Sequence, residues 1–212
     1  MSEIAGFPAD VAPDWTGVHS AVRELHLYWG FHADFCGNEG NVALMQDILP
    51  IPFALIRMAF LTSIAMGIGR LLDPAESHVK GKLRANLSLT RLAQIVRPHA
   101  SESFNSRLAT LLGELRTDAE PIVDRWRDKR FAHADKEMVL DEGPEKLPEV
   151  DRDVFENVLE KMRVILAEIH AHFNCPDAPM TFHVPVGLAD ELMRFIRDGA
   201  KARASEVASM FP

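Results

Sequence analysis

Apolar residues recur every three or four positions along most of this chain, the spacing that places them on one face of an α-helix. The first stripe follows Asp14, a predicted N-cap. A later stripe begins after Ser101 and contains Pro121, where we expect a kink because proline has no backbone N–H to donate. Together the stripes predict helices over residues 15–29, 48–72, 89–96, 104–126, 154–173 and 188–202.

Three segments between these stripes lack a helical period. Residues 36–41 (CGNEGN) predict a turn, and residues 75–87 predict a polar loop. Residues 141–160 contain eight acidic and two basic residues and begin as a proline-containing loop that leads into a capped helix. The pattern as a whole predicts an all-α fold, a helical bundle.

The most apolar stretch of the chain runs from Ile48 to Leu72. Arg57 and Arg70 interrupt it, and a charged side chain is costly in the hydrocarbon region of a bilayer. We therefore expect a buried helix here and no membrane partner.

Composition supports a soluble globular protein, since 47% of the 212 residues are hydrophobic and 25% are charged. The net charge of −8 excludes a protein that coats DNA or RNA by general electrostatics, because such proteins are basic. Two cysteines, Cys36 and Cys175, indicate no disulfide framework and fit a reducing cytoplasm. The N-terminal residues show no apolar run of the kind that a secretory signal needs.

Candidate chemistry is concentrated in RWRDKRFAH, residues 125–133. Arginine presents a planar fork that matches phosphate oxygens, and histidine transfers protons near neutral pH. Arg127 holding a phosphodiester and His133 accepting the proton of a 2′-hydroxyl would suffice for RNA cleavage without a metal. On a regular helix these two side chains would point about 120° apart, so they converge only if the helix ends between them or if two copies meet.

The same residues have a plainer interpretation. Positive side chains followed by a histidine also suit the C-terminal turn of a solvated helix, where they interact favourably with the negative end of the helix dipole. Residue types alone favour this helix-end interpretation.

Histidine spacing predicts neither a metal nor a cofactor. His170 and His172 are two residues apart and so lie on different faces of a helix, and between His19 and His26, which share a face, lies the cation Arg23.

Three segments in order resemble the HEPN domains of the AbiU-like subgroup, which is named after a phage abortive-infection protein. RWRDKRFAHAD (residues 125–135) resembles the motif of that subgroup, in which an arginine, a polar residue and a histidine follow one another. IAMGIGRLLDPAE and NLSLTRL (residues 64–76 and 86–92) resemble its preceding segment, and residues 35–60 resemble the helical entry to it. The resemblance covers roughly Trp29 to Leu140.

The resemblance implies a HEPN-like up-and-down helical bundle with an extra C-terminal helix. Residues 1–140 would form the core with the motif, residues 141–174 an acidic loop and bundle helix of the same domain, and residues 175–212 a proline-containing segment and a C-terminal amphipathic helix. It also implies a homodimer whose two motifs face one cleft, and a cytoplasmic toxin or phage-defence protein that an antitoxin partner would hold in check.

Site residues follow from the same resemblance. Arg127 would stabilise the scissile phosphate, His133 would act as general base or acid, and Asp128, where asparagine is commoner in the family, would support them. The neighbouring basic residues Arg125, Lys129 and Arg130 would bind RNA. Two other functions stay open: a non-catalytic helical module that binds nucleotide, RNA or a protein in the same cleft, and a helical dimer in which Arg127 and His133 only cap a helix.

Overall fold

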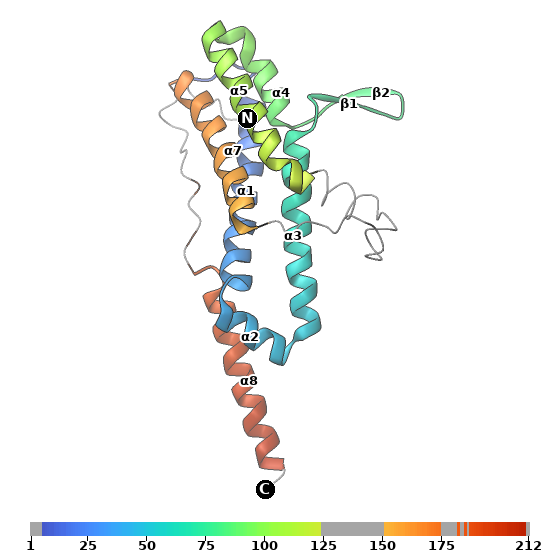
Figure 1. Cartoon of the computed structure of the whole chain (residues 1–212), viewed down its shortest axis with the longest axis vertical. Helices are drawn as coiled ribbons and strands as arrows, with labels where there is room; N and C mark the ends of the chain where they lie inside the picture. The colour runs from blue at the N-terminus through green and yellow to red at the C-terminus, as the bar shows by residue number, and fades with distance from the viewer. Residues whose placement is uncertain (1–5, 124–150, 175–181, 183–184, 186, 211–212) are drawn as a thin grey trace. The chain divides into compact units, whose positions relative to one another are not determined.

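The computed structural model describes residues 6–123, 151–174, 182, 185 and 187–210. Within these residues the fold is all-α, with seven α-helices, a short 3-10 helix and one small two-stranded sheet (Figure 1). The helices are α1 (Ala12–Cys36), α2 (Glu39–Ile48), α3 (Pro50–Leu72), α4 (Leu89–Val96), α5 (Glu102–Glu120), α7 (Arg152–His172) and α8 (Asp190–Met210); η1 (Arg97–His99) follows α4.

The chain forms two compact units. The first contains Met1–Leu25 and Ala65–Phe182, and the second contains His26–Ile64 and His183–Pro212. Two long helices, α1 and α3, therefore contribute one part to each unit.

In the first unit, side-chain caps start the helices where the sequence predicts. Ser88 is buried and its Oγ accepts a hydrogen bond from Arg91 N at 3.2 Å, which begins α4. Ser101 Oγ accepts from Phe104 N in the same way at the start of α5. The predicted cap at Asp14 is wrong. Because α1 already begins at Ala12, Asp14 lies in its first turn, and its Oδ1 pairs with Arg91 Nε at 2.7 Å.

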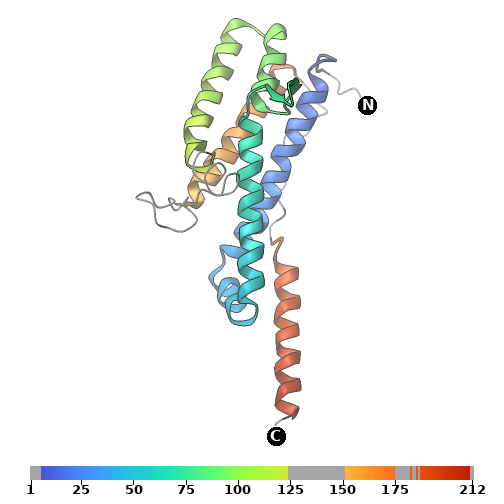
Figure 2. The ribbon, with the colours of Figure 1, turned by 90° about the vertical axis from the view of Figure 1, so that its right-hand side faces the viewer.

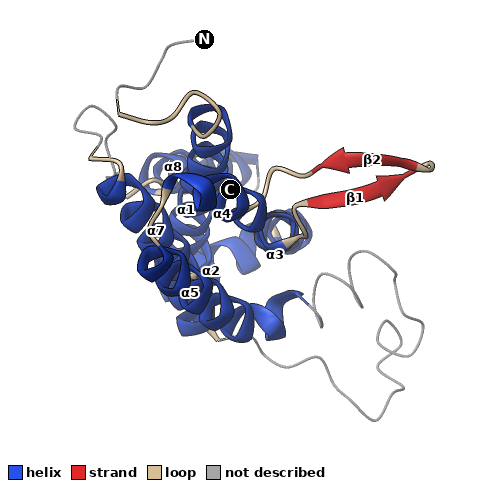
Figure 3. Ribbon diagram, turned by 90° about the horizontal axis from the view of Figure 1, so that it is seen from above, coloured by secondary structure: helices blue, strands red, loops and turns tan. Residues whose placement is uncertain are grey.

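Residues 75–87 are not the loop that the sequence predicts. They contain strands β1 (Glu76–Val79) and β2 (Lys82–Ala85), which pair antiparallel with Val79 opposite Lys82 and extend away from the helices (Figure 3). Lys80 and Gly81 both have positive φ, +51° and +73°, which matches the twist of a two-residue hairpin turn. Seven of the eight strand residues are exposed, so no alternation of polar and apolar positions announces the strands.

Helices α5 and α7 lie side by side in the first unit (Figure 1 and Figure 2). Their facing sides are apolar and buried, with Leu108 and Leu115 from α5 and Val158 and Met162 from α7. The regular α-helix of α5 ends at Glu120, directly before Pro121, and a three-residue π-helical turn follows. The interruption therefore lies where the proline predicts a kink.

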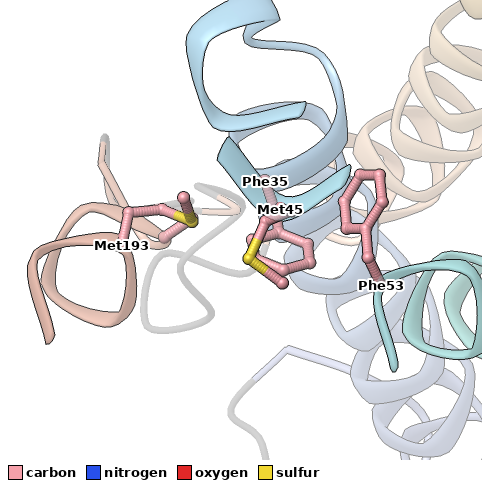
Figure 4. Packing of buried hydrophobic residues seen from close by; sticks show 5 residues of the cluster. Phe35, Met45, Phe53 and Met193 are labelled. Atoms are coloured by element: carbon pink, nitrogen blue, oxygen red, sulfur yellow. The ribbon is translucent and has the colours of Figure 1, made fainter. Parts of the chain in front are cut away.

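The second unit contains a helix that the sequence analysis missed. The turn predicted at residues 36–41 is confined to Gly37 and Asn38, and α2 begins at Glu39. Asn38 is its N-cap, with Oδ1 accepting from Asn41 N at 3.1 Å. The buried cluster of this unit joins α1, α2, α3 and α8 through Phe35, Met45, Phe53, Ala189 and Met193 (Figure 4).

The prediction that Ile48–Leu72 forms a buried helix is wrong for much of α3. The helix is long and apolar enough to span a membrane by length and composition alone, which is weak evidence for a span. Only 22% of its most apolar window is buried. The reason is that one narrow row of side chains packs inward, while the opposite face meets no other described part of the chain.

Candidate functional site

The predicted RNA-cleavage residues belong to the segment that connects α5 to α7. Asp118 Oδ2 of α5 lies 2.6 Å from Lys161 Nζ of α7, and Arg107 of α5 pairs with Glu168 of α7. Residues late in α5 thus meet residues early in α7, so the two helices run antiparallel. It follows that the connecting segment leaves and re-enters the helix pair at one end.

Six predicted site residues lie outside the described part of the chain: Arg125, Arg127, Asp128, Lys129, Arg130 and His133. Their roles, and the convergence of Arg127 with His133, stay predictions. What the structure supplies is the support from which that segment departs.

This support is held together by polar contacts between α5 and α7. The pKa of Asp118 is lowered, chiefly because its carboxylate accepts a hydrogen bond from Lys161, and Asn157 donates a second one. The same contact raises the pKa of Lys161. Both groups are therefore charged at neutral pH, and they hold the end of α5 against the beginning of α7.

A groove between α4 and α5 is a feature that the sequence analysis did not predict. Its volume is about 370 Å³, and its floor includes the buried side chains Leu108 and Leu112. Arg97 and Arg116 also line it, and Arg116 Nη2 donates to Thr90 Oγ1 at 2.8 Å. No sequence motif marks this groove, because its walls come from two helices that meet only in the fold.

The described histidines lie among aromatic rings and surface carboxylates. Trp15 is buried, as the sequence predicts, and stacks on His19 with ring centroids 4.7 Å apart. Its ring also lies 6.0 Å from that of His170. His99 Nε2 contacts Asp10 Oδ2 at 3.0 Å, and this hydrogen bond is the chief cause that lowers the pKa of Asp10.

A metal site was also sought among the described residues. Across 6–123, 151–174 and the short stretches after them, no three His, Cys, Asp or Glu side chains are grouped as a metal ion would require.

Comparison with known families gives one match. The model of the AbiU2 family, a family of HEPN domains, matches residues 22–186. This range includes the segment with Arg127 and His133 and reaches past the roughly 29–140 that the sequence motifs cover. No curated protein and no solved structure shows significant similarity to the chain.

Proposed function

Because this chain belongs to the AbiU2 family of HEPN domains, we propose that it is a metal-independent endoribonuclease of the abortive-infection type. The observation that carries the proposal is the motif formed by Arg127, Asp128 and His133 inside the matched range. Abortive infection is a phage-defence strategy, so the natural setting of the activity would be the cytoplasm of an infected cell.

The chemistry requires one base, one acid and one stabilising cation. In this proposal His133 accepts the proton of the 2′-hydroxyl, and the freed oxygen attacks the adjacent phosphorus. Arg127 stabilises the charge that builds on the phosphoryl oxygens. The bond to the 5′-oxygen breaks and that oxygen takes up a proton, so the products are a 2′,3′-cyclic phosphate and a 5′-hydroxyl end. Asp128 orients the pair through hydrogen bonds.

Neighbouring cations would hold the RNA on either side of the scissile bond. Arg125, Lys129 and Arg130 lie within five residues of Arg127 and supply positive charge that the chain as a whole, at −8, does not. Binding would thus be local and would weaken as salt rises. Two copies of the chain would bring two such segments to one cleft, and an antitoxin partner would cover it until infection.

The test is cleavage of labelled tRNA and of a mixed-sequence RNA by purified protein in excess EDTA. We expect the wild type to cut and to leave 2′,3′-cyclic phosphate ends, and we expect His133→Ala and Arg127→Ala to be inactive. A matched control is His78→Ala, because His78 lies exposed on β1. Equal activity in wild type and His133→Ala would contradict the proposal and indicate a contaminating nuclease.

Folding of the inactive variants must be shown separately. We expect Arg127→Ala and His133→Ala to keep the circular dichroism spectrum and melting temperature of the wild type, because neither side chain belongs to the predicted core. Unfolding of either variant would mean that the residue is structural, and the proposed site would lose its main support.

A non-catalytic binding module is the second candidate function. The observation that favours it is the acidic balance of the chain, including eight acidic residues between 141 and 160, close to the motif. Such charge opposes the approach of RNA. Tight binding of RNA, a nucleotide or a protein without cleavage, weakened in Arg127→Ala, would identify this function.

A further inference from the structure

In the second unit, one row of α3 side chains packs inward. Phe53 is buried and its ring lies 5.5 Å from that of Phe35 on α1, and the ring of Phe60 lies 5.0 Å from that of Phe31. Ile64 continues the row and is fully buried. Figure 4 shows Phe53 beside Phe35 and Met45. The spacing of seven and then four residues keeps these side chains on one face of the helix.

The opposite face of α3 carries a second apolar row. Ile51 and Leu55 are 72% and 67% exposed, and Met58 is also exposed. With Thr62 these residues follow the spacing of four, three and four residues. They are offset by two residues from the inner row, which is about 200° around the helix. We call Ile51, Leu55, Met58 and Thr62 the outer row.

An apolar surface of this kind is unusual on a soluble protein. A helix that is hydrophobic all round is normally buried in a core or in a membrane. Here Arg57 is the single charged residue between Asp47 and Arg70, and it lies close to the inner row, near enough to Cys36 to lower that thiol's pKa. The outer row therefore contains no charged side chain. Contiguous exposed apolar patches commonly mark interaction sites.

We propose that the outer row of α3 binds the outer row of a second copy of this chain, with the two helices antiparallel about a two-fold axis near Leu55 and Met58. A two-fold interface must be complementary to itself. An uncharged apolar row meets that requirement automatically. Its spacing of four, three and four residues is also that of the core positions of a coiled coil, where side chains of facing helices interdigitate. The proposal does not depend on RNA cleavage.

Charge argues against the two other occupants. A helix that lies on a bilayer surface usually has lysine and arginine along its polar face, whereas this stretch has Arg57 alone and the chain carries −8. A specific partner of a different sequence is normally selected by charged positions beside the seam. The positions beside the outer row include Ala54, Ile56 and Ala59, which make no such selection.

The experiment measures the mass of the full chain in solution by light scattering over a range of protein concentrations. We expect the wild type to have twice the chain mass and Leu55→Glu to have the mass of one chain. Leu83→Glu is the matched control, since Leu83 is a leucine on β2 with 56% exposure, and it should stay a dimer. Because Leu55 is exposed, the helical circular dichroism of Leu55→Glu should equal that of the wild type.

Cross-linking provides a second measurement if Leu55→Glu fails to fold. A cysteine near a two-fold axis meets its own copy at a distance that a disulfide can bridge. We expect Leu55→Cys to form a covalent dimer under mild oxidation, and neither the wild type nor Leu83→Cys to do so. Three results would overturn the proposal: a wild type with the mass of one chain, a dimer that Leu55→Glu leaves intact, or a single-chain protein that binds phosphatidylcholine–phosphatidylglycerol vesicles through Leu55.

Discussion

Gly67 of α3 lies so close to Leu25 of α1 that a β-carbon at position 67 would be 2.5 Å from Leu25 Cδ2. Leu25 is buried, so its side chain has little room to move away. The glycine thus serves the close packing of two helices in the first unit, and its place inside GIGR does not make a phosphate-binding loop. Such loops join a strand to a helix, whereas Gly67 lies within α3.

Gly67→Ala should therefore destabilise the protein even though alanine is the better helix former. Overpacking costs about 1–3 kcal/mol, and this exceeds the gain of about 1 kcal/mol in helix propensity. The matched control is Gly113→Ala on α5, where a β-carbon would have no neighbour within 4 Å. Urea unfolding should show a loss of stability for the first variant and a gain for the second. A gain in both would show that the two helices can separate at no cost.

The contact of Asp118 with Lys161 should make the stability of the α5–α7 pair depend on pH. The lowered pKa of Asp118 means that its contribution is present above the ordinary value of 3.8 and is lost as the pH falls through the folded-state value. The raised pKa of Lys161 means that its contribution is present below 10.5 and is lost as the pH rises through its folded-state value. The contact is therefore complete throughout the neutral range.

Lys161→Met should lower the free energy of unfolding by about 0.5–1 kcal/mol at neutral pH, the size expected of a solvent-accessible ion pair. The difference from the wild type should shrink at about pH 3, where Asp118 becomes protonated. Arg194→Met is the control, because Arg194 and Glu191 are 3.8 Å apart on exposed α8 and should contribute nothing measurable. A difference that does not change with pH would assign the effect of Lys161 to packing alone.

Asn41 should be a stability determinant of the second unit. It is buried, its Nδ2 donates to Asp34 O at 3.0 Å, and its Oδ1 accepts from Arg197 Nη2 at 2.8 Å. Asn41→Ala leaves a carbonyl and a guanidinium without their partner, which should cost about 1–3 kcal/mol. In a double-mutant cycle by urea unfolding, Asn41→Ala with Arg197→Ala should cost less than the two single variants added together. Strict additivity would mean that the contact between α2 and α8 is not made in solution.

Cys36 should react slowly with thiol reagents in the folded protein. Burial raises its pKa from 9.0 to about 11, so its thiolate population at neutral pH falls about 100-fold. In a Cys175→Ser background, we expect modification by a chromogenic disulfide reagent to be slow until urea unfolds the chain. Rapid reaction of the native protein would show that the second unit opens readily around Phe35 and Met45.

Much of this fold can be predicted from the sequence because its local signals agree with one another. Ser88 and Ser101 precede apolar stripes and cap α4 and α5, and the stripe at residues 154–173 is buried along α7. The R-D-x4-H motif and the segments before it also identify the family without any structure. These features depend on residues close together in the chain, where propensity and periodicity act directly.

Tertiary structure decided the features in which distant residues compete. Asp14 looks like a cap, yet Arg91, 77 residues away, takes its carboxylate once α1 has begun two residues earlier. The short strands around Lys80 and Gly81 depend on a turn geometry that polar composition does not reveal. Residues 48–72 predict burial by composition, but burial requires a neighbour on every face, and α3 has neighbours on one. Sequence determines which surfaces are apolar, while the arrangement of helices decides which of them are covered.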